Sequence, residues 1–134
     1  MKVFGKKKDE NAVKPRTLTQ LEQLCADDKE TYEALVPVMF LDPRKVETTV
    51  KQAAENAKRF EKDKDSASAR MWYEVAGGLS LYEGNAKKVV EYYGSAERVT
   101  GTKYLILKNP DKAVAKAQEY YSKYLTNAIG VTKT

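Results

Sequence analysis

The strongest constraint on the fold is the spacing of apolar residues between positions 46 and 60. They recur there at intervals of three and four: Val46, Val50, Ala53, Ala54, Ala57 and Phe60. This spacing gathers them on one face of an α-helix, whereas a half-buried strand would need an apolar residue at every second position. With Asp42 as a cap and Pro43 at the first helical position, we predict one helix of about 30 Å that ends near Lys62.

Two capping boxes predict shorter helices upstream. In Thr19–Glu22 and in Asp27–Glu30, the first and fourth side chains can each bond an unpaired backbone N–H at a helix start. Pro37 should kink or shorten the second helix, because proline removes a backbone donor and crowds the preceding turn. The apolar residues of that helix are Tyr32, Leu35, Val36, Met39 and Phe40.

Three further segments with helical spacing follow. The first runs from about Ala67 to Tyr82, and Gly77 and Gly78 within it allow another helix to approach closely. Its predicted inward residues are Trp72, Val75, Ala76, Leu79 and Tyr82. The second begins at Asn85 and either ends at Gly101 or continues to Lys108, with Tyr104–Leu107 interpreted as helix rather than as a short strand. The last begins at Asn109-Pro110, and its predicted inward residues are Ala113, Val114, Ala117, Tyr121, Tyr124 and Leu125.

These patterns predict an all-α protein. The chain has 134 residues, which suits one domain. We expect that domain to span residues 17–127 and to contain five or six helices, arranged as an antiparallel bundle or as stacked helical hairpins. Residues 1–16 are interpreted as a flexible basic tail, and residues 128–134 as a C-terminal tail.

One fragment resembles a known repeat. The segment Lys103–Pro110 is similar to the end of the second helix of a tetratricopeptide repeat, and Trp72, Gly77 and Gly84 lie roughly where that repeat places an aromatic and two small residues. The resemblance implies stacked helical hairpins. The chain departs from the pattern in two ways: Gly84 and Pro110 are 26 residues apart, and no second copy occurs at a period of about 34 residues.

Composition argues against most enzyme chemistry. The chain has no histidine and one cysteine, Cys25, which removes the commonest general base, the commonest zinc ligand and every Ser-His or Cys-His nucleophile. We interpret Cys25 as a small buried residue whose pKa is raised by Asp27 and Asp28. No convergent acidic pair is visible, so a carboxylate-dependent enzyme is the least favoured alternative. We expect no catalytic residue, metal or cofactor.

The net charge of +5 is unevenly distributed. Residues 1–16 carry six basic and two acidic side chains, while residues 17–127 carry 17 of each. This neutral body argues against a dedicated nucleic-acid binder, whose positive charge should lie on the fold. Within the body, residues 17–41 have a net charge of −4 and residues 103–124 a net charge of +3. Either these two regions pack together, or they are separate surfaces for partners.

The last helix contains the main candidate contacts. Lys112, Lys116 and Lys123 lie within about 40° of one another on a helical wheel, with Tyr120 at their border. This stripe could bind a phosphate backbone and stack on a base, could dock an acidic helix such as residues 17–41, or could be a solvated face. A second basic cluster lies near the N-terminus: Lys6, Lys7 and Lys8.

The favoured function is a non-enzymatic helical interaction module that binds a protein partner or itself. One form that this function could take is a small subunit of a larger assembly. The alternative is an accessory nucleic-acid-binding protein that uses the basic tail and the last helix. A membrane protein is disfavoured, because the apolar run at positions 34–41 is far shorter than the about 20 residues of a membrane span. With no signal-peptide pattern we expect a cytoplasmic protein. The excess of Lys and Glu over Asn and Gln favours a heat-adapted source.

Overall fold

The computed structural model describes residues 16–39 and 41–125, with the side chains of residues 16–18 left aside. These residues form helices and connecting segments and contain no strand, which confirms the predicted all-α class. The α-helices are α2 (Arg16–Leu24), α3 (Lys29–Leu35), α4 (Val50–Lys62), α5 (Ser66–Glu83), α6 (Ala86–Thr100) and α7 (Pro110–Tyr120). The short turns are the 3-10 helices η1 (Pro43–Lys45) and η2 (Leu105–Leu107) and the π-helical turn η3 (Tyr121–Leu125).

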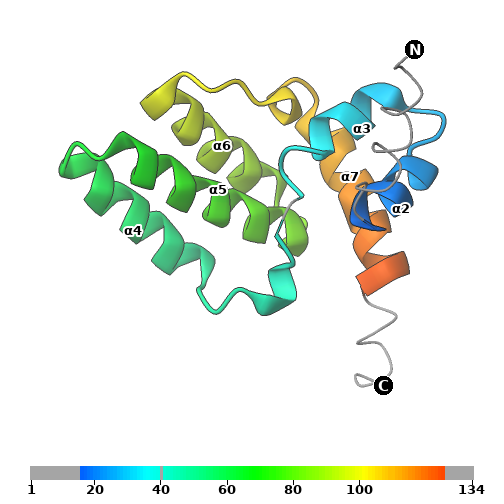
Figure 1. Ribbon diagram of the computed structural model, residues 1–134, viewed down its shortest axis with the longest axis horizontal. Helices are drawn as coiled ribbons and strands as arrows, with labels where there is room; N and C mark the ends of the chain where they lie inside the picture. The colour runs from blue at the N-terminus through cyan, green and yellow to red at the C-terminus, as the bar shows by residue number, and fades with distance from the viewer. Residues whose placement is uncertain (1–15, 40, 126–134) are drawn as a thin grey trace, which may run out of the picture.

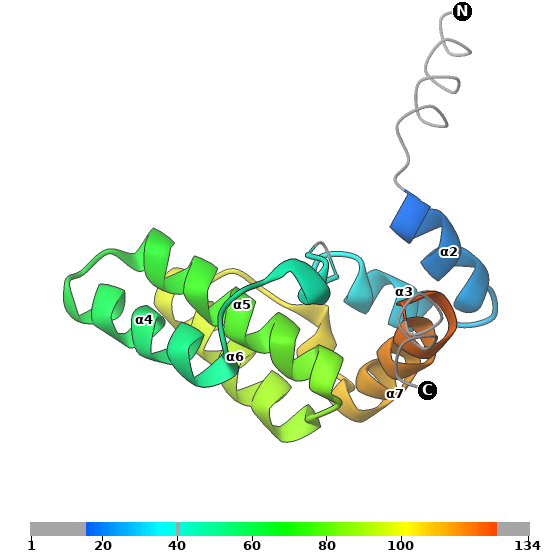
Figure 2. The ribbon, with the colours of Figure 1, turned by 90° about the horizontal axis from the view of Figure 1, so that it is seen from below.

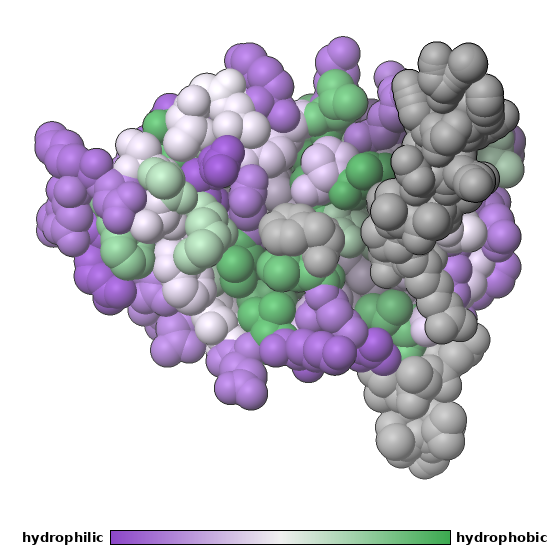
Figure 3. Space-filling view, in the orientation of Figure 1, coloured by the Kyte–Doolittle hydropathy of each residue, from purple (hydrophilic) through white to green (hydrophobic). Residues whose placement is uncertain are grey.

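The helices of residues 16–39 and 41–125 form two groups. The helices α4, α5 and α6 lie side by side with α5 in the middle, and α7 packs beside α3 at one end of this layer (Figure 1). The view from below places α2 in the same group as α3 and α7 (Figure 2). The segment that contains η1 crosses α5, where Leu41 and Val46 lie close to Leu79. Apolar surface is visible near that crossing, with hydrophilic surface towards the ends of the molecule (Figure 3).

The predicted long helix from Asp42 to Lys62 is wrong in its first third. Asp42 caps only η1, because its carboxylate accepts hydrogen bonds from both the backbone N–H and the guanidinium of Arg44. The chain then becomes extended at Val46, with φ −87° and ψ 120°. The α-helix starts only after Thr49, whose hydroxyl oxygen accepts the backbone N–H of Gln52 at 3.1 Å.

The apolar face of the resulting 13-residue helix is partly as predicted. Ala53, Ala54 and Ala57 are buried against the core, whereas Phe60 is half-buried. Val50 is the first residue of α4 and is also half-buried, so it is not at the centre of a long buried face.

The starts of α2 and α3 differ from the predicted capping boxes. The helix α2 begins at Arg16, so Thr19 lies inside it and not at its cap. Asp28, one residue later than predicted, caps α3 by accepting the Thr31 N–H at 3.2 Å and the Thr31 hydroxyl at 2.7 Å. The helix α3 ends at Leu35, ahead of Pro37, which confirms that the proline shortens it.

The buried face of α5 is rotated from the predicted one. Trp72, Val75, Leu79 and Tyr82 are only half-buried. The fully covered residues are Ala69, Tyr73, Ala76, Gly77, Ser80 and Leu81. The prediction followed the large apolar side chains, but α5 lies between α4 and α6 and turns its small residues towards these neighbours.

At Gly77 the helices α5 and α6 approach each other closely. A Cβ atom at this position would lie 2.5 Å from Cε2 of Tyr93, whose side chain is completely buried. The Tyr93 ring therefore lies on the backbone of α5 at a place where only glycine leaves room for it. This contact confirms the predicted close approach of a second helix at Gly77. At Gly78 a Cβ atom would lie 3.8 Å from the Tyr93 hydroxyl oxygen, which is an ordinary contact.

The helix α6 ends at Gly101, which excludes one continuous helix to Lys108. Gly101 adopts φ 79° and its N–H bonds the carbonyl of Glu97 at 2.7 Å, the left-handed ending that glycine favours. The chain then forms the single turn η2, so Tyr104–Leu107 is neither an α-helix nor a strand. Ile106 is buried by this turn, and Leu105 is left 43% exposed.

A carboxylate on α4 connects the three helices of the layer. Glu61 accepts the hydroxyl of Tyr73 on α5 at 2.8 Å and pairs with the guanidinium of Arg98 on α6. The bonds from Arg98, and then the bond from Tyr73, lower the pKa of Glu61. Because the folded form prefers the charged carboxylate, protonation of Glu61 should weaken the layer.

This pairing predicts a loss of stability in acid. A lowered pKa in the folded protein contributes stability that is complete above the ordinary glutamate value of about 4.3 and is lost as the pH falls through the lowered pKa. We expect Glu61→Gln to be less stable than the wild type at pH 7 and to lose less on acidification from pH 5 to pH 3. Urea unfolding at several pH values measures this. Glu55→Gln, at an exposed position of the same helix, should keep the wild-type pH profile.

Candidate functional site

The predicted lysine stripe of α7 is partly paired within the molecule. Nζ of Lys112 lies 3.1 Å from Oδ2 of Asp28, the cap of α3, and Nζ of Lys116 lies 2.9 Å from Oε1 of Glu119. At Lys112, the basic last helix therefore packs against acidic residues 17–41, which is one of the interpretations that the sequence left open. The two helices also pack directly against each other.

The acidic partner of Lys112 is held in its charged form. The hydrogen bonds from Thr31 lower the pKa of Asp28, and the bond from Lys112 acts in the same direction. On the other side of the stripe, the bond to Glu119 raises the pKa of Lys116. The folded protein therefore favours the charged forms of Asp28 and Lys116.

The prediction that Tyr120 borders an exposed stripe is wrong. Its side chain is 3% exposed, and its hydroxyl lies 3.2 Å from Oε1 of Gln20 on α2. Its ring contacts those of Tyr121 and Tyr124, at centroid distances of 5.9 and 4.9 Å. The wheel placed Tyr120 at the edge of the core, and the packing of α2 covers that edge. A ring covered in this way is not available to stack on a base.

The remaining predicted contact residues are placed differently. Lys123 lies in η3 and is exposed, with its ammonium 5.4 Å from the centroid of the Tyr124 ring. Lys6, Lys7 and Lys8 lie outside the described residues. The structure thus brings Lys112 and Lys116 together on α7 and separates Tyr120 from them by burial.

Cys25 is the small buried residue that its sequence context predicted. Its side chain is 3% exposed, and burial is the main cause of its raised pKa. Asp28 and Asp27 also raise this pKa, as predicted, while Lys116 opposes them. A protonated, covered thiol is a poor nucleophile.

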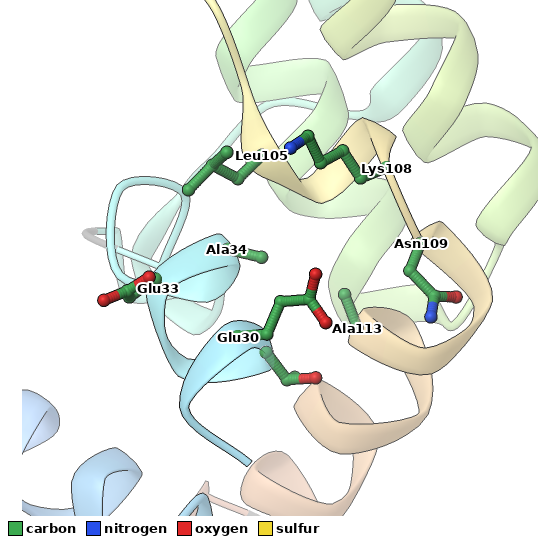
Figure 4. A pocket seen from close by; sticks show the side chains of 8 residues that line it. Glu30, Glu33, Ala34, Leu105, Lys108, Asn109 and Ala113 are labelled. Carbon is green, nitrogen blue, oxygen red and sulfur yellow. The ribbon is translucent and has the colours of Figure 1, made fainter.

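A pocket of about 150 Å³ lies between α3, η2 and α7 and was not predicted from the sequence. Ala34 and Ala113 are buried within its lining, and Leu105 contributes an exposed apolar side chain (Figure 4). We call this the α3 pocket. Its full lining is Glu30, Thr31, Glu33, Ala34, Leu105, Lys108, Asn109 and Ala113.

The α3 pocket combines an apolar lining with charged side chains. The carboxylate of Glu30 points into the space between α3 and Ala113, while Glu33 lies at the outer side of α3 and Lys108 at the opposite edge (Figure 4). None of these three forms an ion pair with another described residue. Such a pocket can accept the stem of a long basic side chain and bind its charged end at Glu30.

Comparison with known protein families, with curated proteins and with solved structures finds no match. The partial resemblance to a tetratricopeptide repeat therefore stays a prediction. Within residues 16–39 and 41–125, no group of three or more histidine, cysteine or acidic side chains is arranged to hold a metal ion. Over the same ranges, every helix is too short or too polar to cross a bilayer.

A weak signal for the α3 pocket was present in the sequence. The charge of −4 over residues 17–41 exceeds what Lys112 neutralises, and Leu105 lies in an apolar run that follows a glycine. The pocket itself depends on Gly101 turning the chain back towards α3. That turn decides which residues of two distant segments face each other.

Proposed function

We propose that this chain is a non-enzymatic interaction module, a small subunit that binds another protein by accepting a basic side chain in the α3 pocket. The observation that carries this proposal is the carboxylate of Glu30, which points into a pocket with an apolar lining and has no ion pair with a described residue.

The chemistry of the pocket favours lysine or arginine as the group bound. Their methylene stems suit the surfaces of Ala34, Ala113 and Leu105, and their charged ends suit Glu30, with Glu33 nearby. Lys108 at the far edge would repel a long run of positive charge, which limits binding to one or two basic residues. A partner segment with a single basic anchor between apolar residues fits this arrangement.

Two properties of the chain support a binding role over catalysis. It contains no histidine, and its one cysteine is covered and has a raised pKa. Histidine, the commonest acid–base group near neutral pH, and a reactive cysteine nucleophile are therefore lacking.

The nucleic-acid alternative has less support in the described residues. Lys112 and Lys116 have acidic partners, and Tyr120 is buried. The carboxylates of Glu30 and Glu33 would repel a phosphate backbone. This alternative now depends on the basic N-terminal segment and on what remains exposed of the α7 stripe.

Peptide binding tests the proposed function. We expect the full chain to bind a fluorescent peptide in which a single lysine lies between alanines, and not a peptide with glutamate in place of that lysine. Glu30→Lys should weaken this binding at least about tenfold, because it places a positive charge where the anchor binds. The control Glu55→Lys makes the same change of net charge on α4 and should leave the affinity close to that of the wild type.

Two outcomes would contradict the proposal. One is an equal loss of affinity in Glu30→Lys and Glu55→Lys, which would mean that the peptide responds only to net charge. The other is stronger, salt-sensitive binding of a single-stranded oligonucleotide by the same protein, which would favour the nucleic-acid alternative.

A further inference from the structure

We infer that the partner segment carries an acidic residue close to its basic anchor, and that Lys108 binds this acidic residue while Glu30 binds the basic one. This inference rests on the proposed function, because it adds a second charge to the partner that the α3 pocket is proposed to bind. The pocket would then recognise a pair of opposite charges and not a single positive one.

Charges of opposite sign lie on opposite edges of the α3 pocket. Glu30 and Glu33 belong to α3, and Lys108 lies across the pocket from them at the end of η2 (Figure 4). All three residues are exposed, and no ion pair joins Lys108 to either carboxylate. Neither sign is therefore neutralised within the described residues, and each edge can bind a group of the opposite charge.

The backbone holds Lys108 at this edge. Its N–H bonds the carbonyl of Leu105 at 3.0 Å, and its φ of −76° and ψ of −36° are helical. Asn109 and Pro110 then start α7 directly after it. Because η2 and α7 fix the residue from both sides, the Lys108 side chain starts from the rim of the pocket in every rotamer.

Lys108 has no acidic partner among the described residues. Along the sequence, the nearest acidic side chain is that of Asp111 in the first turn of α7, which does not line the pocket and forms no ion pair with Lys108. The neighbouring Asn109 is exposed, lines the pocket and makes no capping hydrogen bond with its side chain. Its amide can therefore join the Lys108 ammonium in binding a carboxylate.

A mixed pair of charges fits this pocket better than either sign alone. A segment with several positive residues places a further charge against Lys108, and a segment with only negative residues meets Glu30 and Glu33. A basic residue with an acidic one nearby matches both edges. Between the edges, the segment contacts Ala34 and Ala113, which are 7% and 2% exposed. This contact displaces water from around the bound charges, which strengthens both ion pairs.

A double-mutant cycle between Lys108 and a peptide tests the contact. The peptides are alanine chains with blocked ends and one lysine, with either glutamate or glutamine placed two, three or four positions to either side of it. On the wild-type full chain, we expect at least one glutamate peptide to bind about two- to fivefold more tightly than its glutamine twin, the gain of an exposed ion pair. In Lys108→Gln this difference should disappear. Isothermal titration calorimetry measures the affinities.

Reversal of the charge at Lys108 sharpens the test. Lys108→Glu should prefer a peptide in which a second lysine replaces the glutamate, so that the order of the two affinities is inverted. Lys51→Glu makes the same change of net charge at an exposed position of α4 and should keep the wild-type order. An inverted preference cannot result from loss of folding, because an unfolded variant would bind neither peptide.

Three results would overturn the inference, and they separate it from the proposed function. Equal affinities for glutamate and glutamine peptides, still sensitive to Glu30→Lys, would reject the role of Lys108 and keep the proposed function. A glutamate preference that persists in Lys108→Gln would place the acidic residue elsewhere on the surface. Absence of binding by every peptide, including the one with a single lysine, would reject the proposed function and this inference with it.

Discussion

Replacing Gly77 with alanine should destabilise the protein by about 3 kcal/mol, although alanine is the better helix former. The added Cβ would lie 2.5 Å from Cε2 of Tyr93, a separation that requires one group to move. Tyr93 is completely buried between α5 and α6, so its ring cannot swing into solvent. The strain must then be relieved by separating the two helices, which weakens the packing along their whole length.

Gly94 provides the matched control for this substitution. It lies within α6, and a Cβ atom there would meet nothing within 4 Å. Gly94→Ala should therefore stabilise the protein by about 0.5–1 kcal/mol through helix propensity alone. Urea unfolding of both variants measures the contrast. Similar stabilities for the two would show that α5 and α6 are not in close contact at Gly77.

Local signals were sufficient to predict the fold class and several helix boundaries. Asn85 caps α6 through a hydrogen bond to the backbone N–H of Lys88, Gly101 ends that helix, and Pro37 limits α3. Each of these effects operates within a few residues of the chain and needs no tertiary contact. These helix boundaries could therefore be predicted from the sequence.

Other features depend on tertiary contacts and could not be predicted. Ser80 and Gly77 are buried because α5 lies between two helices, although neither residue is strongly apolar. Tyr120 is covered by Gln20, 100 residues away along the chain. The α3 pocket likewise joins α3 to a turn more than 70 residues later. Periodicity within one segment does not show which other segment will cover it.

Asp42 shows how a strong local signal can mislead. An aspartate followed by proline is a typical helix start, and Asp42 does cap a turn. The turn stops at Lys45, since the chain becomes extended at Val46, one of the β-branched residues with low helix propensity. The second cap, at Thr49, then starts the helix that the periodicity had indicated.

Because α4 begins only after Thr49, Val50 lies in its first turn, and the most sensitive position of the helix is Ala57. Ala57 is completely buried, so Ala57→Asp places a carboxylate in the core without a partner. We expect a loss of more than about 4 kcal/mol, a large part of the about 5–15 kcal/mol that stabilises a typical domain. Thermal and urea unfolding should show a protein that is largely unfolded or that melts far below the wild type.

The same substitution in the first turn of α4 should be much milder. Val50 is half-buried and Lys51 is exposed, and a carboxylate near a helix N-terminus gains about 0.3–1 kcal/mol from the helix dipole. We therefore expect Val50→Asp to cost about 1 kcal/mol, from lost apolar contact offset by this gain, and Lys51→Asp to change stability little. If Val50→Asp were as damaging as Ala57→Asp, Val50 would have to lie deep in the core, and the helix would have to begin well before Thr49.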